Sequence, residues 1–541
     1  MRSSRMTPEL IETYTKPGLW EDRLVDDYVA EAGKRRPDSV AIIDRGRSRS
    51  FAEVEQLVER AARMLWALGV RPGEAVSWQL PNWIEGVVLH QAALRIGAVS
   101  NPIVAIYRER EVRFILGQSR SKVFFAPATF RRFDYVAMVN KLRPELPDLE
   151  HIVVVGDKAS GNALSFDELM AEDGKPFPEL ERSPNDVALL LYTSGTTSEP
   201  KGALHTHNTL DYENRSIIDL FGLTSRDVIF MPSPITHITG LLYGAQLPFM
   251  LGATVVLQDI WDTDEAVGLI DRNQCTFSVG ATPFLDGIVT KTSDREAGAN
   301  TLRVFACGGA DVPPDLIRRA TTRLGGFVTR VYGSTEYPTA LSGAPGDPLE
   351  KCAGTDGRPI ADAQARVVTA DGGIADPGVE GELQVRGPEL FLGYLDENLN
   401  IDSFTAQGWF KTGDLATTDA DGFVQITGRQ KDIIIRGGEN ISAKEIEDLL
   451  FEHPKVAEAS VVGSPDPVLG ERVCAFVVPR DGQNLELAEM VNFLRSQGIA
   501  NQKLPESLIV LDQMPSTASG KIQKFKLRDL AKDGVEQGAS P

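Results

Sequence analysis

Hydrophobic residues between about positions 187 and 332 form short continuous runs instead of alternating with polar residues. Helical patterns separate the runs, most clearly at 264–273 and at 314–324, where a proline lies in the first turn and its missing amide costs little. Continuous apolar runs of this length are typical of parallel strands that are buried on both faces. The pattern therefore predicts parallel βαβ units, with one strand ending at Leu191 and others at 228–231, 254–257, 276–279, 304–306 and 327–331.

The pattern changes twice toward the C-terminus. Beyond about Asp356, glycines punctuate β-hairpin patterns such as GELQVRG (381–387) and DGFVQITG (421–428), which indicates an antiparallel subdomain. After Arg429 an α+β pattern follows, with helices at 442–452 and 485–496, the first opened by a Ser442 and Glu445 capping box. We therefore expect an α/β fold with a large N-terminal region (1–428) of βαβ sheets and a β-hairpin subdomain, a hinge (429–431), and a small mobile C-terminal α+β domain (432–541).

Length and charge narrow the class of protein. A chain of 541 residues exceeds one ordinary core and can bury ample apolar surface. Its 56 Lys and Arg against 76 Asp and Glu give a net charge of −20, which argues against nucleic acid or an anionic membrane as partner and makes any phosphate site a local exception. No signal peptide or spanning segment is recognised, so we expect a cytoplasmic protein without stable membrane insertion. Four distant cysteines without metal spacing indicate free thiols, namely Cys275, Cys307, Cys352 and Cys474.

The segment LLLYTSGTTSEPKG (189–202) carries the clearest candidate chemistry, because an apolar run ends in a loop of hydroxyls, glycines and one lysine. Such a loop offers donors and a positive charge to a polyphosphate. Its lysine precedes the glycine, which is not the spacing of the common nucleotide-binding loop. A polar surface turn is the alternative that this segment alone leaves open. The donors are Thr193, Ser194, Gly195, Thr196, Thr197, Lys201 and Gly202.

Ligands of parallel sheets gather beyond the carboxyl ends of the strands, which directs attention to four further loops. These loops are PSPITHITG (232–240), GATP (280–283), CGGA (307–310) and YGSTE (332–336). The carboxylate of Glu336 suits Mg²⁺ that bridges phosphate oxygens, although a solvated glutamate is equally compatible with the motif. His237 is the only histidine that we expect in this layer, either as a catalytic residue or packed in the core.

Three segments near the C-terminus add polar side chains. Asp414 in GWFKTGDLA is expected in a tight turn, where a carboxylate can accept from both hydroxyls of a ribose, or can simply stabilise the turn. Arg429 and Lys431 lie at the domain junction and fit either a solvated linker or a nucleotide-contacting hinge. Lys521 in PSTASGKIQK precedes a basic helix and, by itself, is most simply a solvated lysine.

Taken together, these segments resemble the adenylate-forming (AMP-binding) superfamily of acyl-CoA synthetases, adenylation domains and luciferases, over about residues 20–529. The likeness is greatest to bacterial short- and medium-chain acyl-CoA synthetases and alicyclic acid CoA ligases, notably in GLWEDRLVDDY (18–28) and GGENISAKEIED. The resemblance implies that a carboxylic acid reacts with ATP, in the presence of Mg²⁺, to give an acyl-adenylate and pyrophosphate. Coenzyme A then displaces AMP.

The resemblance also implies a role for each matching residue. Residues 193–202 would hold the β and γ phosphates, with Thr196 and Glu336 at the magnesium, Thr335 at the α phosphate, Tyr332 on the adenine, Gly309, Ala310 and Gly333 beside the nucleotide, and Asp414 and Arg429 at the ribose. Lys521 would bridge the acid and the α phosphate, Lys431 would be the hinge, and Gly437 and Gly438 would line a thiol tunnel. The acid pocket would be lined by His237, Gly240, Gly280, Ala281 and Gly308, near Phe284.

Several points stay open at this stage. Pro234, Ile235 and Thr236 offer no charge for an α-amino group, so a carboxylic acid without an ammonium is favoured, but its length and ring content are not fixed. A stand-alone enzyme that loads a carrier protein is the nearest alternative. A catalytically silent AMP-binding protein is a third, against which the presence of both Lys201 and Lys521 argues. Ser198 replaces the glycine of most relatives, and a homodimer is neither indicated nor excluded.

Overall fold

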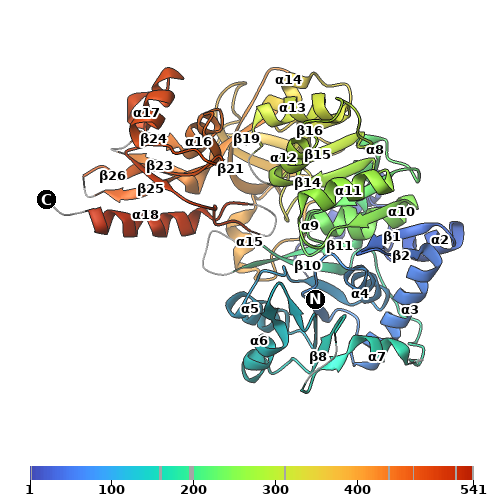
Figure 1. The fold of residues 1–541 in the computed structure, drawn as a ribbon. Coiled ribbons are helices and arrows are strands. Elements are labelled where there is room, and N and C mark those ends of the chain that lie inside the picture. Colours follow the sequence, from blue (N-terminus) through green and yellow to red (C-terminus); the bar gives the residue numbers. More distant parts are fainter. Residues whose placement is uncertain are drawn as a thin grey trace.

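The computed structural model describes residues 1, 3–157, 161–172, 174–193, 200–309, 312–436, 439–466, 468–517 and 521–538. Three sheets and their helices form a large lobe, and a fourth sheet with three helices forms a small lobe beside it (Figure 1). This arrangement confirms the expected α/β fold with a small C-terminal α+β domain. Within the described residues no helix combines the length and the apolar character that a membrane crossing requires. All four cysteines are buried and unpaired.

A nine-stranded sheet contains the strands predicted from the continuous apolar runs. Its central strands β13, β12, β14, β15 and β16 are neighbours and run parallel, which confirms the predicted βαβ series. In spatial order the strands are β18 (Arg358–Pro359), β17 (Leu341–Ser342), β16 (Phe327–Tyr332), β15 (Val304–Gly308), β14 (Phe277–Gly280), β12 (Val228–Met231), β13 (Thr254–Leu257), β1 (Val40–Asp44) and β2 (Arg47–Ser50).

A seven-stranded sheet lies beside the first in the large lobe, and it corrects one expectation. The apolar run that ends near Leu191 belongs to this second sheet, and its next strand is an antiparallel hairpin partner rather than a parallel neighbour. A buried apolar run does not specify the direction of the neighbouring strand, so the run alone was misleading. In spatial order the strands are β11 (Lys201–Thr206), β10 (Val187–Thr193), β4 (Val99–Pro102), β3 (Ala75–Trp78), β5 (Val123–Ala126), β8 (His151–Val154) and β9 (Leu164–Ser165).

One apolar core joins the two sheets, because residues of α3, α4 and α8 pack between strands of both. A two-stranded ribbon, β6 (Thr129–Phe130) with β7 (Phe133–Asp134), lies apart from the sheets. The large-lobe helices are α1 (Pro8–Thr15), α2 (Asp27–Arg35), α3 (Phe51–Ala67), α4 (Ile84–Arg95), α5 (Glu109–Ser119), α6 (Tyr135–Leu142), α7 (Phe166–Ala171), α8 (His207–Phe221), α9 (Ile238–Gly240), α10 (Leu247–Leu251), α11 (Thr263–Asn273), α12 (Thr282–Lys291), α13 (Pro314–Leu324), α14 (Leu349–Gly354) and α15 (Asn398–Ser403).

The third sheet is antiparallel throughout, as the glycine-punctuated pattern predicted. It consists of β19 (Gln364–Val368), β20 (Gly381–Arg386), β21 (Phe410–Thr418) and β22 (Val424–Arg429). Strand β22 ends at Arg429 and the small lobe begins with β23 at Ile433, with one 3₁₀ turn (Gln430–Asp432) between them. The hinge at 429–431 stays a prediction.

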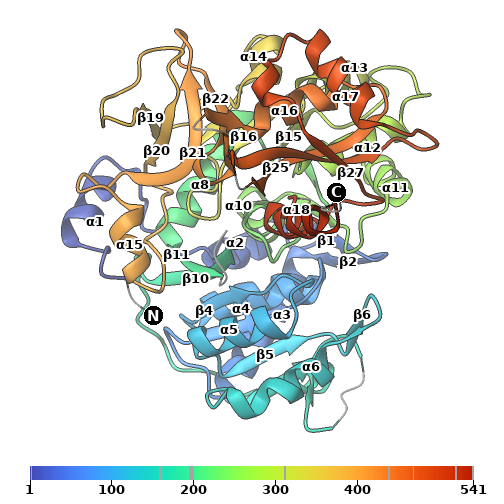
Figure 2. The same cartoon turned by 90° about the vertical axis from the view of Figure 1, so that its left-hand side faces the viewer.

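The small lobe surrounds its own apolar core and follows the α+β pattern predicted after Arg429. Ser442 caps α16 by accepting from the Glu445 amide, which is one half of the expected capping box, while the Glu445 carboxylate pairs with Lys503 (2.6 Å). Figure 2 shows the lobe from the side that faces left in Figure 1, with α18 in front of the large lobe. The elements are β24 (Glu439–Ser442), β23 (Ile433–Arg436), β26 (Gly470–Pro479), β25 (Val456–Asp466), β27 (Ser507–Val510), α16 (Ala443–Phe451), α17 (Leu487–Ser496) and α18 (Lys524–Gly538).

Candidate active site

Four of the loops singled out in the sequence meet along one edge of the nine-stranded sheet. His237 follows β12, Gly280 ends β14, Gly308 ends β15 and Tyr332 ends β16. Carboxyl ends of parallel strands share an edge, so residues far apart in the sequence become neighbours there. The cavity described next opens at this edge.

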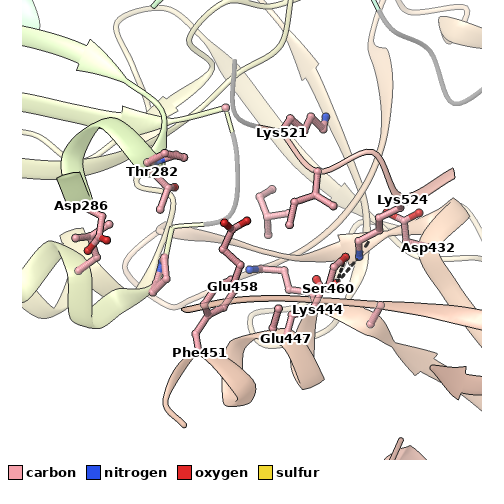
Figure 3. Close-up of a pocket in the computed structure, with 18 of the residues that line it drawn as sticks. Thr282, Asp286, Asp432, Lys444, Glu447, Phe451, Glu458, Ser460, Lys521 and Lys524 are labelled. Carbon is pink, nitrogen blue, oxygen red and sulfur yellow. Dashed lines mark hydrogen bonds and ion pairs between the residues drawn. The ribbon is translucent and has the colours of Figure 1, made fainter. Parts of the chain in front are cut away.

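A cavity of about 590 Å³ lies between this edge and the small lobe (Figure 3). Thr282 and Asp286 of α12 line one side, while Lys444 and Glu458 approach from the small lobe. The cavity is also lined by the predicted nucleotide residues Gly309, Tyr332, Gly333, Asp414 and Arg429, and by Lys521. Residues of both lobes therefore form one site.

Asp414 forms the centre of a group of three polar side chains. Its Oδ2 accepts a hydrogen bond from the Tyr332 hydroxyl (2.6 Å), and its Oδ1 pairs with Arg429 Nε (2.7 Å). Burial, and then the Asp414 charge, raises the pKa of Tyr332 well above its usual range. The tyrosine therefore stays a hydrogen-bond donor and fixes the carboxylate in one orientation.

The expected turn around Asp414 is wrong, because the residue lies inside β21. The register between β20 and β21 shifts just before it, and Gly413 has φ +71°. Such a bulge re-aims the side chain that follows. Glycine at 413 permits the positive φ that this bulge requires.

Tyr394 lies between Glu336 and the lysine of the 189–202 segment. Glu336 Oε1 accepts from the Tyr394 hydroxyl (2.7 Å), and Lys201 Nζ lies 5.0 Å from the centre of the Tyr394 ring. Tyr394 was missed in the sequence, since a tyrosine within the apolar run LFLGYL has the pattern of a core residue. The carboxylate of Glu336, a hard oxygen donor whose charge acts on Lys521, fits Mg²⁺.

A second histidine holds the same loop, which corrects the expectation that His237 is the only one in this layer. His205 Nε2 donates to the Thr335 carbonyl (2.7 Å), and Nδ1 lies 3.2 Å from Thr209 Oγ1. Burial lowers the pKa of His205 to about 4, so the ring is neutral at neutral pH. His205 thus acts on the backbone next to Glu336 without adding charge.

Four cations of this acidic chain converge on the site. Burial lowers the pKa of Lys521 to about 8, and the nearby Arg429 lowers it further while Asp414 and Glu336 oppose the shift. Burial lowers the pKa of Lys431 too, followed by the charges of Lys201 and Arg429. Like charges held together in this way predict an anionic ligand.

Lys521 also acts on His237, the histidine that follows β12. Burial lowers the pKa of His237 to about 4, and the Lys521 charge adds to the effect. The Lys521 amine therefore lies near enough to His237 for its charge to act on the imidazole. A neutral imidazole at this position can accept or donate a hydrogen bond but carries no charge at neutral pH.

The segment that carries Lys521 is joined by ion pairs to the residues around the predicted hinge and to α16. Arg528 of α18 pairs with Asp432 and donates to the Lys431 carbonyl (3.1 Å). Lys524 Nζ lies 2.8 Å from Glu447 Oε1, and Glu447 in turn accepts from the Val461 amide (2.5 Å). The dashed contacts among Lys524, Glu447 and Ser460 are visible in Figure 3.

Close packing explains two glycines of the predicted acid pocket. A Cβ at Gly240 would lie 2.1 Å from the Pro234 carbonyl oxygen, and one at Gly308 would lie 2.3 Å from the Val331 carbonyl oxygen.

A π-helical turn (Leu241–Gln246) follows Gly240 and was not predicted. Such turns are frequent at functional sites. Trp261 and Phe284 pack together at 4.7 Å between ring centres near α12.

Several predicted site residues lie outside the described part of the chain, and their roles stay predictions. These residues are Ser194, Gly195, Thr196, Thr197, Ala310, Gly437 and Gly438, together with the unusual Ser198.

Comparisons with known proteins agree with this geometry. The model of the AMP-binding enzyme family matches residues 29–395, and that of the AMP-binding enzyme C-terminal domain matches residues 445–521. A medium-chain fatty-acid–CoA ligase of Escherichia coli is 38% identical over 519 residues, which cover 95% of this chain and 92% of that protein. A salicyl-AMP ligase / salicyl-S-ArCP synthetase of Mycobacterium tuberculosis is 34% identical over 521 residues, with 95% and 91% covered.

The solved structures include close matches to the whole fold. The crystal structure of an anthranilate CoA ligase in complex with anthranoyl-AMP matches this chain with a TM-score of 0.85 and 25% sequence identity. The match covers 95% of this chain and 98% of that one.

Proposed function

This chain belongs to the AMP-binding enzyme family, and we propose that it is an ATP-dependent carboxylic acid:CoA ligase. A carboxylate oxygen of the acid attacks the α phosphorus of ATP, the bond from that phosphorus to the bridging oxygen breaks, and pyrophosphate leaves. The sulfur of coenzyme A then attacks the acyl carbon of the acyl-adenylate, its proton passes to solvent, and AMP leaves. The products are acyl-CoA, AMP and pyrophosphate.

The convergence of Lys201, Arg429, Lys431 and Lys521 carries this proposal. The chain has a net charge of −20, yet these cations meet beside the acceptor Asp414. A carboxylate and a phosphate repel each other as they approach, and preorganised cations offset that repulsion where charge develops. Nucleotide and acid are the ligands that need this combination.

Each residue acts on a separate part of ATP in this proposal. Asp414, oriented by Tyr332 and Arg429, accepts from the ribose hydroxyls, and the Tyr332 ring lies against the adenine. Thr335, held by His205, meets the α phosphate, while Lys201 meets the β and γ phosphates with the remaining donors of 193–202. Gly309 and Gly333 let backbone approach the nucleotide.

Glu336, with Thr196, would hold Mg²⁺, and the bound ion would supply positive charge that offsets the charge of the phosphates. Tyr394 and the Lys201 above its ring orient the carboxylate of Glu336. His205 holds the adjacent backbone. The site residues thus fix the metal ligand before ATP enters.

Lys521 stabilises the charge that develops between the acid and the α phosphate. We place the hinge at 429–431, so that rotation of the small lobe withdraws Lys521 after adenylation and brings 437–438 to the thiol path. His237, neutral at neutral pH, lines the acid pocket with Gly240, Gly280, Ala281 and Gly308 rather than exchanging protons.

The acid is a fatty, alicyclic or aromatic acid without an α-amino group. Pro234, Ile235 and Thr236 provide no counter-charge for an ammonium, and the matched relatives are named for fatty, salicylic and anthranilic acids. Loading of a carrier protein is the second candidate, favoured by the salicyl-S-ArCP synthetase relative. The cytoplasm is the proposed compartment, consistent with four unpaired cysteines.

Lys521→Ala tests the proposal through its two half-reactions. We expect loss of acid-dependent pyrophosphate release, because the amine acts only in adenylation, and retention of thioester formation from supplied acyl-adenylate. Lys526→Ala, on the exposed face of the same segment, is the matched control and should keep both reactions. Equal loss of both half-reactions in a folded Lys521→Ala protein would contradict the role of this lysine. A panel of acids, offered with coenzyme A or with a pantetheinylated carrier, identifies the acid and the acceptor.

A further inference from the structure

Two glutamates lie fully buried beneath the loop that carries Glu336. Glu213 on α8 and Glu389, which follows β20, each have 0% of their surface exposed. No cation is among the groups that act most strongly on either carboxyl in the described part of the chain. Instead, the charge of Glu213 acts on Glu389. The proposed reaction uses neither residue.

Hydroxyl groups connect this pair of glutamates to the Glu336 loop. Tyr243, in the π-helical turn after His237, donates to Glu213, and its hydroxyl lies 2.7 Å from Thr339 Oγ1. Tyr337, which is 1% exposed, lies with its hydroxyl beside the Glu389 carboxyl. Tyr337 comes directly after Glu336, and Thr339 follows three positions after it. The glutamate pair therefore supports this loop and joins it to the segment that carries His237.

The loop itself is closed by short backbone contacts, so a movement of its underside moves Glu336. The Ser334 amide donates to the Tyr337 carbonyl (2.8 Å), and the Ala340 amide donates to the Tyr332 carbonyl (2.9 Å). A Cβ at Gly333 would lie 1.8 Å from the Pro338 carbonyl oxygen. Little free space remains in which the loop can adjust.

Two buried carboxylates without a counter-ion are strongly unfavourable, and a shared proton removes one charge. Oε2 of Glu213 and both oxygens of Glu389 accept no hydrogen bond of ordinary geometry from the described residues. Burial raises the pKa of Glu213 to about 7 and that of Glu389 well above its usual range. The polar and charged groups that face the pair are Tyr14, Tyr212, Tyr243, Tyr337, Thr339 and Asp362.

We propose that Glu213 and Glu389 are positioning residues that together retain at least one proton, called here the shared proton whichever carboxyl carries it, and thereby hold the Glu336 loop in its binding geometry. Loss of that proton sets two like charges against each other under Tyr337 and Thr339 and displaces the loop. The effect on catalysis rests on the proposed function, because it acts through the magnesium ligand. The presence of the shared proton does not depend on the proposed function.

Infrared difference spectra of the whole protein without substrates test the shared proton. The comparison is between the wild type and the double variant Glu213→Gln, Glu389→Gln, which keeps the side-chain shapes but cannot ionise. At neutral pH we expect the wild type to show a protonated-carboxyl C=O band that the double variant lacks. Each single variant guards against misfolding of the double one. If the protonated-carboxyl band of the wild type is unchanged in every variant, both carboxyls are ionised, as they would be around a bound cation, and the proposal is overturned.

Acid-dependent exchange of pyrophosphate into ATP tests the positioning role. From about pH 6 to about pH 9, we expect the rate of the wild type relative to the double variant to fall severalfold, as the shared proton is lost. Lys521 is present in both proteins, so its own titration cancels in the ratio. A ratio that stays constant with pH overturns the positioning role. A wild type without any exchange refutes the proposed function instead, and the infrared result still decides the shared proton.

Tyr243→Phe separates positioning from simple stability. Loss of one hydrogen bond of about 1 kcal/mol should raise the Mg²⁺ concentration for half-maximal exchange about fivefold. Tyr135→Phe, on α6 and away from the site, is the matched control. It also removes the hydroxyl of a buried tyrosine, which donates a hydrogen bond to the Ala105 carbonyl (2.7 Å). An equal Mg²⁺ requirement in both variants contradicts the link between the glutamate pair and Glu336.

Discussion

The pKa of Lys521 leads to a prediction about the pH dependence of adenylation. A lysine is charged below its pKa, and burial places this one at about 8 instead of its usual 10.5. About nine tenths of the free enzyme then carry the charge at about pH 7, half at about pH 8 and roughly one tenth at about pH 9. If the charged amine is required, kcat/KM for ATP falls roughly tenfold for each pH unit well above 8.

The assay is acid-dependent exchange of pyrophosphate into ATP, measured at low ATP so that it reports the free enzyme. Thioester formation from supplied acyl-adenylate serves as the internal control, because Lys521 does not act in it. Lys521→Arg keeps the charge throughout this pH range and should show a much smaller alkaline decline, with only the part due to Glu213 and Glu389 remaining, even if its rate is lower. An alkaline decline that persists unchanged in Lys521→Arg would refute the assignment to this amine.

Two further variants test the architecture of the site. Tyr332→Phe removes the hydroxyl that donates to Asp414 (2.6 Å), and loss of a hydrogen bond to a charged group should raise KM for ATP roughly tenfold; an unchanged KM contradicts the ribose role of Asp414. Asp356→Ala leaves the buried Arg330 without its partner (2.8 Å) and should lower the free energy of unfolding by about 3–5 kcal/mol in urea, whereas Asp148→Ala, at an exposed pair, should change it by about 1 kcal/mol at most.

The parallel strands of the nine-stranded sheet were predictable because strands buried on both faces must be apolar throughout. Strands β12 and β13 begin and end where the apolar runs do. The direction of a neighbouring strand was not predictable from the same pattern of apolar residues. Strand β10 is as apolar as they are, yet it pairs antiparallel with β11, because that pairing depends on the length and course of the following loop.

The loop residues of the site were recognised by their motifs, but their supporting contacts were not. His205 and Thr335 are 130 positions apart, and Tyr394 and Glu336 are 58 apart. No local pattern encodes such contacts, since they arise from the packing of β11 and of the segment after β20 against the loop. Glu213 and Glu389 were missed for the same reason: a glutamate in a helix or a loop is ordinarily solvated.

The pairing of Arg528 with Asp432 has a consequence for inhibition. Because α18 is fastened to the residue that follows the proposed hinge, Lys521 would move together with the small lobe, and the extent of that movement would depend on a few backbone torsions between Arg429 and Asp432. A compound that fills the cavity between α12 and α16 would arrest that movement, and it would also occupy space beside Tyr332 and Asp414, which line the same cavity. Such an inhibitor would be competitive toward ATP.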